Sequence, residues 1–278
     1  TVSLAIDIGG TFTDAVLENN KRRFTAKVLT TKNHPEAGFL AAAKKVLNVS
    51  NMQPKDVDFI IHGTTLATNA IIERKGAKTA LLTTDGFTDS LEIAYEHRFE
   101  QSDLFMERPK PLVPRHLRLG IKERIAADGS ILIPLDMSSV EEAIAKCREE
   151  KVEAIAIGFL HCYTNDEHEK SVKSFIQSTL PDIPVSISSQ VSPEIREYDR
   201  LSTTVANAYI LPLMKTYLEN LGAALIQQGY SAPLLMMMSS GGMTTLKTAK
   251  TLPIRLVESG PAGGAILSRI ISAECGLR

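Results

Sequence analysis

Two glycines flanked by acidic and hydroxyl side chains follow the first apolar run of the chain, Val2–Ile8. The segment reads Asp7-Ile8-Gly9-Gly10-Thr11-Phe12-Thr13-Asp14. Glycines let main-chain N–H groups approach an anion closely, and threonine hydroxyls add donors. A carboxylate at a strand end, Asp7, is suited to hold Mg²⁺ directly or through water beside phosphate oxygens. The pattern predicts a phosphate clamp made by Gly9, Gly10, Thr11 and Thr13; a plain Gly-Gly turn with an exposed aspartate is the alternative.

A second polar cluster follows another apolar run and reads His62-Gly63-Thr64-Thr65-Leu66-Ala67-Thr68-Asn69. Polar residues at the carboxyl end of a parallel strand tend to line the ligand crevice of an α/β sheet. His62 could orient a substrate carbonyl or relay a proton, with Thr64, Thr65 and Asn69 as hydrogen-bond donors to substrate. The alternative is that a threonine only caps the following helix and that His62 is a satisfied structural residue.

Two more glycine turns occur late in the chain. Gly241 and Gly242 follow a third apolar strand, and Gly260 and Gly263 precede a helix. A glycine loop at a helix N-terminus offers free N–H groups and a favourable dipole to an anion. Both turns are therefore candidates for cofactor binding, although plain turns or close helix packing would use the same residues.

Other chemical signatures do not occur in the sequence. It contains no GxxxxGK[ST], no GxGxxG after the first strand, and neither HExxH nor GxSxG. The acidic run Asp166–Glu169, with His161 nearby, resembles a metal cluster. Acidic residues at a helix start are better explained by capping and by the helix dipole.

The elements that position these residues begin with three strands near 2–8, 13–18 and 22–29. A helix from Pro35, a strand at 57–61, a helix at 66–74 and a strand at 79–83 follow. Three meandering strands and two right-handed crossovers form one mixed sheet with helices on its faces. We therefore predict an α/β fold with a ribonuclease-H-like unit, the unit from which actin-type ATPases are built, over residues 1–84.

The remaining sequence divides into two portions. Residues 85–190 contain further strand and helix patterns and are expected to form an inserted or accessory α/β portion. Residues 191–278 begin with a long helical stretch interrupted at Pro212 and are expected to start a second half of the fold.

Composition limits the class of protein. The 278 residues are 44% hydrophobic, and 31 Lys+Arg against 32 Asp+Glu give a net charge of −1, so no basic field attracts nucleic acid or anionic lipid. No apolar stretch approaches the ~20 residues that span a bilayer, and the N-terminus lacks the basic flank of a signal peptide. The three cysteines are odd in number and outside any CxxC pair. We expect reduced thiols, a cytoplasmic protein, and a residue or tag removed before Thr1.

Several strings together resemble the hydantoinase A / 5-oxoprolinase family, which includes N-methylhydantoinase A and the acetone carboxylase β subunit. They are the two polar clusters described above, the continuation of the second to Gly76, and four later segments: Leu81–Phe87, Glu197–Tyr209, Ser239–Gly242 and Ser259–Gly264. The resemblance runs from the first strand to near residue 275.

The resemblance implies an actin-like ATPase fold and ATP-dependent opening of a cyclic amide such as a hydantoin or an oxoproline-like lactam. ATP would phosphorylate the amide oxygen, and water would attack the activated product, with a hydantoinase B-like partner subunit in an oligomer. By the motif match, Gly9, Gly10, Thr11 and Thr13 fall on the first phosphate loop and Asp7 on its Mg²⁺ side. Asp7 and His62 are the catalytic candidates.

The family's second phosphate loop, of the Asp-Met-Gly-Gly-Thr type, does not occur in this sequence. We therefore expect the N-terminal part of a hydantoinase-A-type protein that carries half of the nucleotide clamp. Three other functions remain open: the ATPase subunit of an acetone-carboxylase-like enzyme, a sugar-kinase-like small-molecule kinase, and a module that binds a partner subunit without catalysis.

Overall fold

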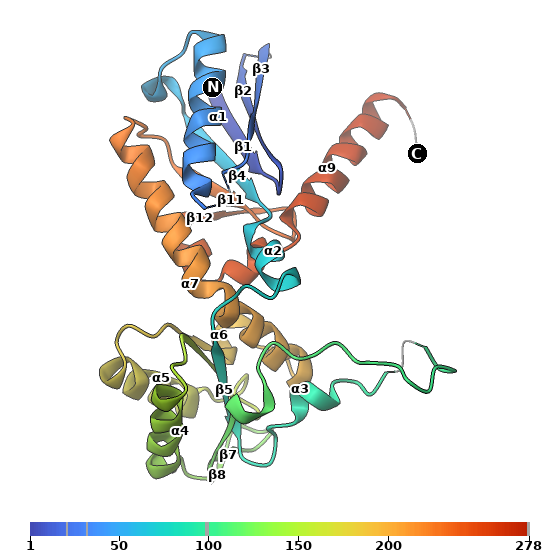
Figure 1. Ribbon diagram of the computed structural model, residues 1–278, viewed down its shortest axis with the longest axis vertical. Helices are drawn as coiled ribbons and strands as arrows, with labels where there is room; N and C mark the ends of the chain where they lie inside the picture. The colour runs from blue at the N-terminus through green and yellow to red at the C-terminus, as the bar shows by residue number, and fades with distance from the viewer. Residues whose placement is uncertain (21, 32, 98–99, 277–278) are drawn as a thin grey trace. The chain divides into compact units, whose positions relative to one another are not determined.

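The computed structural model describes residues 1–20, 22–31, 33–97 and 100–276 (Figure 1). The chain forms two compact units. The first unit combines residues 1–75 with the chain from Leu213 onward, and the second unit is Gly76–Pro212. These limits differ from the predicted divisions 1–84, 85–190 and 191–278, because the chain leaves the first unit after Lys75 and returns to it within a helix.

The first unit is built on a six-stranded sheet in the order β12-β11-β4-β1-β2-β3. β1 (Val2–Ile8), β2 (Phe12–Asn19) and β3 (Arg22–Leu29) form the predicted antiparallel meander. After α1 (Pro35–Ser50), β4 (Phe59–Thr64) pairs parallel to β1 and leads into α2 (Leu66–Ile72). The mixed α/β sheet predicted from the sequence is confirmed for these elements.

The predicted membership of the next strand in this sheet is wrong. β5 (Thr79–Thr84) belongs to the sheet of the second unit. Its expected place beside β4 is taken by β11 (Leu234–Met237), which pairs parallel with β4 through Leu234 and Ile60. All six residues of β5 are buried, and such a uniformly buried strand fits the interior of any parallel sheet. Its local pattern therefore does not specify its neighbours.

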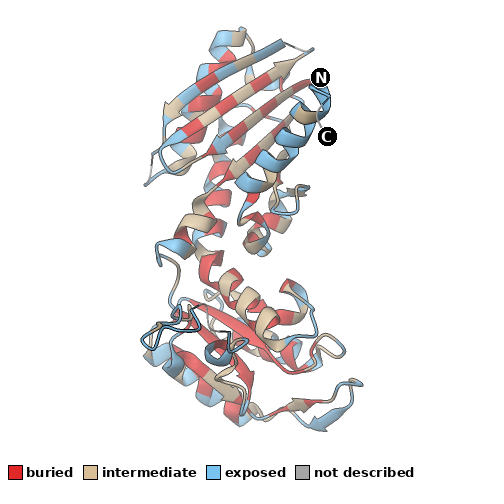
Figure 2. Ribbon diagram, turned by 90° about the vertical axis from the view of Figure 1, so that its right-hand side faces the viewer, coloured by how far each residue is buried: buried red, intermediate tan, exposed pale blue. Residues whose placement is uncertain are grey.

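One face of the first sheet is buried beneath helices. Alternate residues of β1 and β4 are buried, and Figure 2 shows this alternation as stripes along the strands. α1 contributes Phe39 to that interior, and α7 (Glu197–Gln227) contributes Tyr217. The intervening strand residues, such as Asp7 and Gly63, therefore lie on the opposite face.

The second unit contains a parallel sheet in the order β10-β9-β5-β6. Its core is formed by apolar residues of these strands and of the helices Met137–Glu149 (α4) and Glu167–Thr179 (α5), including Leu81, Ile157 and Ile144. Its elements besides β5 and the first part of α7 are α3 (Ser90–Ile93), β6 (Arg118–Ile121), β7 (Arg124–Ile125), β8 (Ile131–Ile133), α4 (Met137–Glu149), β9 (Ala154–Gly158), α5 (Glu167–Thr179), β10 (Val185–Ile187) and α6 (Ser188–Val191).

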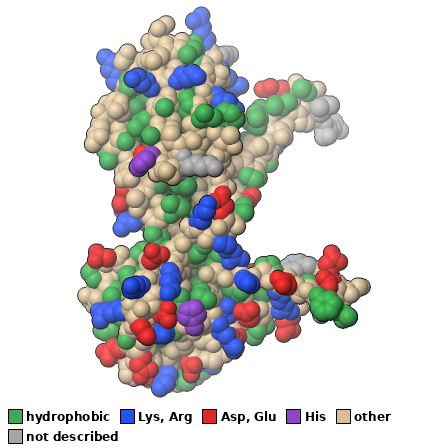
Figure 3. Space-filling model, viewed as in Figure 1, with side chains coloured by type: hydrophobic (Ala, Val, Ile, Leu, Met, Phe, Trp, Pro, Cys, Tyr) green, Lys and Arg blue, Asp and Glu red, His purple; other side chains and the backbone are tan. Residues whose placement is uncertain are grey.

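After α7 the chain completes the first unit. It forms the hairpin of β11 with β12 (Met243–Thr245), then α8 (Leu246–Thr251) and α9 (Ser259–Glu274). Short 3-10 turns occur at Pro54–Asp56, Arg115–Leu117 and Pro253–Leu256. Hydrophobic side chains lie on the surface of α9 in Figure 3; Ile266, Leu267, Ile270 and Ile271 are exposed. Within the described residues, no helix is both long and apolar enough to cross a membrane.

Candidate functional site

Three turns of the first unit meet at one edge of its sheet. β1, β4 and β11 run parallel, so the segments after Ile8, Thr64 and Met237 emerge at the same edge. The start of α9 lies there as well, because the Glu258 N–H donates to Thr68 Oγ1 of α2 at 3.2 Å. The carboxyl edge of parallel strands is where ligands of α/β sheets bind. Both polar clusters predicted from the sequence therefore share one edge.

The Gly9–Gly10 turn is held by hydrogen bonds on both sides. The Gly9 N–H donates to the Phe12 carbonyl at 2.9 Å, and the Thr30 hydroxyl donates to the Gly9 carbonyl at 2.9 Å. A Cβ at Gly9 would lie 3.1 Å from the Phe12 oxygen, so the turn leaves little room for a side chain. Gly10 and Thr11 are exposed beside it. The turn is a fixed, accessible strip of backbone of the kind that binds phosphate.

A pocket of about 400 Å³ opens beside this turn. Its volume falls within the range of roughly 300–1,000 Å³ that small-molecule sites occupy. Four predicted residues lie in its wall: Gly9, Gly10, Thr65 and Asn69. The other lining residues are Ile8, Thr30, Asn33, Pro35, Leu66, Ala70, Glu73, Lys75 and Leu213.

Asp7 lies outside this pocket. It is next to Gly63 in the β1–β4 register, and a Cβ at Gly63 would lie only 2.7 Å from Asp7 Oδ1. Its direct partner on β2 is Asp14, which pairs with Lys27 at 3.1 Å. Partial burial of the carboxyl, followed by the charge of Asp14, raises the pKa of Asp7. Two neighbouring carboxylates on an open face form an oxygen donor set that fits Mg²⁺.

His62 faces the buried interior of the first unit. It is completely buried, and its Nδ1–H donates to the Ile6 carbonyl at 2.9 Å. Nε2 therefore accepts from the Tyr217 hydroxyl at 2.6 Å. Burial lowers the pKa of His62 to about 4, against the opposing effect of the Ile6 carbonyl. The imidazole is neutral and has no free nitrogen, so the geometry favours the structural role over the catalytic one.

Two threonines also differ from their predicted roles. Thr64 is buried, and its hydroxyl accepts from the Leu66 N–H at 3.1 Å, at the first residue of α2. Thr13 is buried with its hydroxyl 3.0 Å from that of Thr30. Thr13 therefore supports the loop through Thr30, and its hydroxyl does not reach the surface where a phosphate would lie.

The late glycines mostly serve packing. Gly241 has a φ of +82°, and a Cβ there would lie 3.0 Å from Ile266 of α9. A Cβ at Gly263 would lie 3.4 Å from the Met237 side chain, and one at Gly242 would lie 3.2 Å from that of Met238. The approaches at Gly241 and Gly263 bring the β11–β12 hairpin against α9, and the one at Gly242 lies within the hairpin loop. Gly260 faces open space at the first turn of α9 and is the one of these four with room beside it for a ligand.

Thr30 and Asn33 also line the pocket, although they are not among the residues predicted from the sequence. Since β3 is antiparallel to β2 and β2 to β1, β3 runs parallel to β1 and ends at the same edge. The residues that follow Leu29 were therefore candidates by the same rule that selected Thr65.

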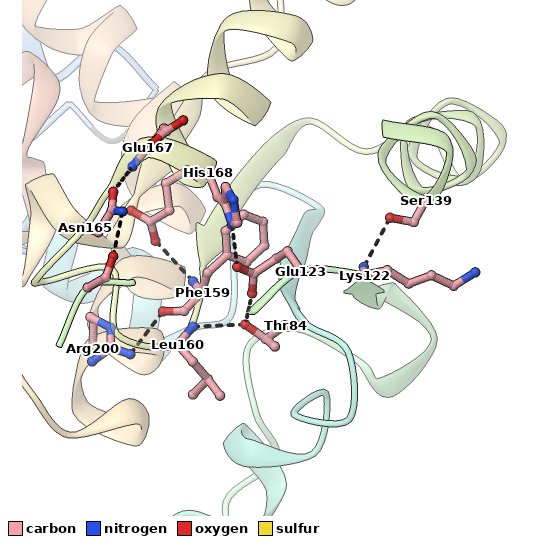
Figure 4. A network of polar contacts seen from close by, with 12 residues as sticks. Thr84, Lys122, Glu123, Ser139, Phe159, Leu160, Asn165, Glu167, His168 and Arg200 are labelled. Carbon is pink, nitrogen blue, oxygen red and sulfur yellow. Dashed lines mark hydrogen bonds and ion pairs between the residues drawn. The ribbon is translucent and has the colours of Figure 1, made fainter. Parts of the chain in front are cut away.

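His168 and Glu169 of the acidic run are part of a buried polar network in the second unit (Figure 4). Glu123 accepts from Thr84 and lies 2.8 Å from His168 Nδ1. Glu169 accepts from the Phe159 N–H and the Ser188 hydroxyl. Among the residues that the structure describes, no group of three His, Cys, Asp or Glu side chains is arranged to hold a metal ion. The network joins α5 to the carboxyl ends of the parallel strands.

Two family profiles match the chain. Residues 3–180 match the hydantoinase/oxoprolinase N-terminal region, and residues 200–277 match hydantoinase/oxoprolinase. The chain belongs to the hydantoinase/oxoprolinase family. The family resemblance predicted from the sequence is confirmed.

The chain is similar in sequence and structure to several members of this family. It is 37% identical to the alpha subunit of the caprolactamase of Pseudomonas jessenii over 93% of the chain and 38% of that relative. It is 32% identical to the acetophenone carboxylase gamma subunit of Aromatoleum aromaticum over 99% of the chain and 40% of that relative. The crystal structure of the ATP-dependent caprolactamase from Pseudomonas jessenii superposes with a TM-score of 0.89 at 35% identity, covering 99% of this chain and 41% of that one. The chain thus spans about two fifths of the length of these relatives, and the actin-like ATPase fold predicted for it is confirmed.

Proposed function

We propose that this chain is the nucleotide-binding part of an ATP-dependent hydrolase that opens hydantoin or 5-oxoproline-like rings. One observation carries the proposal: the Gly9–Gly10 turn follows Asp7 on the open sheet face and also forms a wall of the 400 Å³ pocket. A phosphate bound to this turn would therefore lie between the Asp7 carboxylate and a pocket large enough for a small ring. The ATP-dependent caprolactamase to which the chain is similar acts on a cyclic amide, which supports the same class of substrate.

The chemistry follows from the poor reactivity of an unactivated amide. ATP supplies a phosphoryl group to the amide oxygen, which turns that oxygen into a leaving group for attack by water. The residues of this chain contribute positioning and electrostatic stabilisation. Main-chain N–H groups at Gly10 and Thr11 bind the phosphates, and the pocket holds the ring beside them, with Thr65 and Asn69 as donors.

Asp7 is the proposed Mg²⁺ residue, with Asp14 beside it. Bound there, the cation would neutralise charge on the phosphates. A Cβ at residue 63 would push against Asp7 Oδ1, so glycine at that position leaves the carboxylate its place on the open face. Of the late glycines, Gly260 is kept as a nucleotide contact, while Gly241, Gly242 and Gly263 are explained by packing.

An oligomer with a partner subunit is part of the proposal. The relatives named above are subunits, alpha in the caprolactamase and gamma in the acetophenone carboxylase. We expect a hydantoinase B-like subunit to complete the hydrolysis, and a cytoplasmic location. The carboxylase relative keeps a second function in view, an ATPase subunit that activates a ketone for carboxylation.

The test is phosphate release from ATP by the full-length protein with its candidate partner subunit. Hydantoin, 5-oxoproline, a simple lactam, and acetone with bicarbonate are compared as stimulants, and a sugar serves as the kinase control. Stimulation by a cyclic amide supports the proposed hydrolase. Stimulation by acetone and bicarbonate alone assigns the ketone carboxylase function, and stimulation by the sugar alone contradicts both.

A further inference from the structure

The carboxamide of Asn69 has a fixed orientation in the pocket wall. Its Nδ2 donates to Thr65 Oγ1 at 3.3 Å, one turn earlier in α2. The Thr65 hydroxyl in turn donates to the Ile8 carbonyl at 3.2 Å. Because that hydroxyl has a single hydrogen, which it donates to the Ile8 carbonyl, its oxygen must be the acceptor for Asn69. This series of hydrogen bonds therefore fixes the orientation of the carboxamide, with its nitrogen toward Thr65.

One donor and one acceptor of this carboxamide remain for a ligand. Nδ2 carries two hydrogens, and Thr65 takes one of them. In the described part of the chain, Oδ1 of Asn69 forms no hydrogen bond. The half-buried side chain thus keeps one N–H and its C=O for a ligand in the pocket wall.

A ring amide is complementary to this edge. Closure of a small ring holds the amide in the cis form, so its own C=O and N–H point to the same side. A carboxamide pairs with such an edge through two parallel hydrogen bonds, donating to the ring oxygen and accepting from the ring N–H. A ketone has no N–H, and in an open-chain trans amide the N–H points away from the side of the C=O. Neither can therefore form both hydrogen bonds.

The surroundings of Asn69 suit a ring in this position. The apolar side chains of Ile8, Leu66 and Leu213 line the same pocket and can cover the methylene groups of a lactam. A Cβ built on Gly10 would lie 3.9 Å from Asn69 Nδ2, so the amide end reaches the glycine turn. An oxygen held by Nδ2 would therefore lie beside the turn that is proposed to bind phosphate.

We propose that Asn69 is a specificity-determining residue that recognises the cis N–H and C=O edge of a cyclic amide. The inference rests on the proposed function of the site and adds a restriction to it. The ring must carry hydrogen on the nitrogen of the amide that is opened. Thr65 is a positioning residue that keeps the carboxamide in the required orientation.

The experiment compares two substrates with the full-length protein and its partner subunit. ε-Caprolactam and N-methylcaprolactam differ only at the nitrogen, and kcat/KM is measured for each by ATP-coupled ring opening. The wild-type protein is expected to prefer the N–H ring by about 10- to 100-fold, the effect of losing one or two neutral hydrogen bonds. Asn69→Leu is expected to bring that preference close to one.

Asn69→Asp keeps the shape and an acceptor for the ring N–H but removes the donor to the ring oxygen. It is expected to lower kcat/KM for the N–H ring by about tenfold or more. Asn48→Asp, the same change at an exposed residue of α1, is the matched control and should retain the wild-type values.

The preference between the two rings separates recognition from folding. A variant that is merely damaged would lose activity on both rings in proportion, whereas loss of recognition changes their ratio. An unchanged ratio in Asn69→Leu, while the wild type opens lactams, would overturn the role of Asn69 and leave the proposed hydrolase intact. Failure of every ring to stimulate the wild type would overturn the proposed function and this inference with it.

Discussion

The Tyr217 hydroxyl of α7 donates to Nε2 of His62 on β4 at 2.6 Å, inside the first unit. The two residues are 155 positions apart in the sequence, and both are buried. Phe39 of α1 packs edge-on against the same imidazole, 5.0 Å between ring centres. A histidine beside a polar cluster thus connects a strand to two helices.

Tyr217→Phe should destabilise the first unit. The substitution keeps the ring but leaves Nε2 of a fully buried histidine without a partner, at a cost of about 1–3 kcal/mol. Urea denaturation measures the change. Tyr163→Phe, which removes a hydroxyl from a half-buried site near His161, is the matched control and should cost less. Equal losses in the two variants would argue against the burial of His62 as the cause.

Acid should destabilise the protein through His62. In the unfolded chain this residue takes up a proton near pH 6.5, whereas the folded state keeps it neutral down to about pH 4. The unfolded state therefore binds more protons between these values, and stability falls by roughly 3 kcal/mol as the pH drops through that window. Unfolding free energies from pH 7 to pH 4 in wild type and His62→Gln provide the comparison. The variant should show a shallower fall, and parallel curves would contradict the prediction.

Asp7→Ala in the full-length protein should reduce ATP hydrolysis by about 100-fold or more. Loss of a residue that only supports a metal ligand typically lowers activity by about 10- to 100-fold, and loss of the ligand itself should cost more. Phosphate release is measured at neutral pH, with exposed Asp182→Asn as control. Unchanged turnover in Asp7→Ala would remove Asp7 from the proposed metal role.

Gly63→Ala tests the position of Asp7 without removing its charge. The new Cβ would lie 2.7 Å from Asp7 Oδ1, so the carboxylate must move. Alanine is otherwise favourable to the backbone by about 0.5–1 kcal/mol relative to glycine in a strand. We expect at least a tenfold loss of ATP hydrolysis with no comparable loss of thermal stability. Gly264→Ala on α9, where a Cβ meets nothing, should retain both properties. Full activity in Gly63→Ala would show that Asp7 tolerates displacement.

Local patterns predicted the strands and helices around the site well. The apolar run before Asp7, the hairpin at Asn19 and the proline at the start of α1 all have short-range causes, and the structure has an element at each. The partner of β4 could not be found this way. β11 lies about 170 residues after β4, and a buried strand carries no mark of its neighbour.

The sequence alone determined the glycine turn, the family of the chain, and the strand ends at which polar residues gather, because the succession of elements along the chain and the spacing of glycines are local properties. The tertiary structure decided what each residue faces. In the parallel register Asp7 pairs with Gly63 and Ile6 with His62, so Asp7 and His62 project to opposite faces. Helices α1 and α7 cover the face of His62 and make it structural, while Asp7 stays on the open face. Which face is covered depends on packing between segments far apart in the chain.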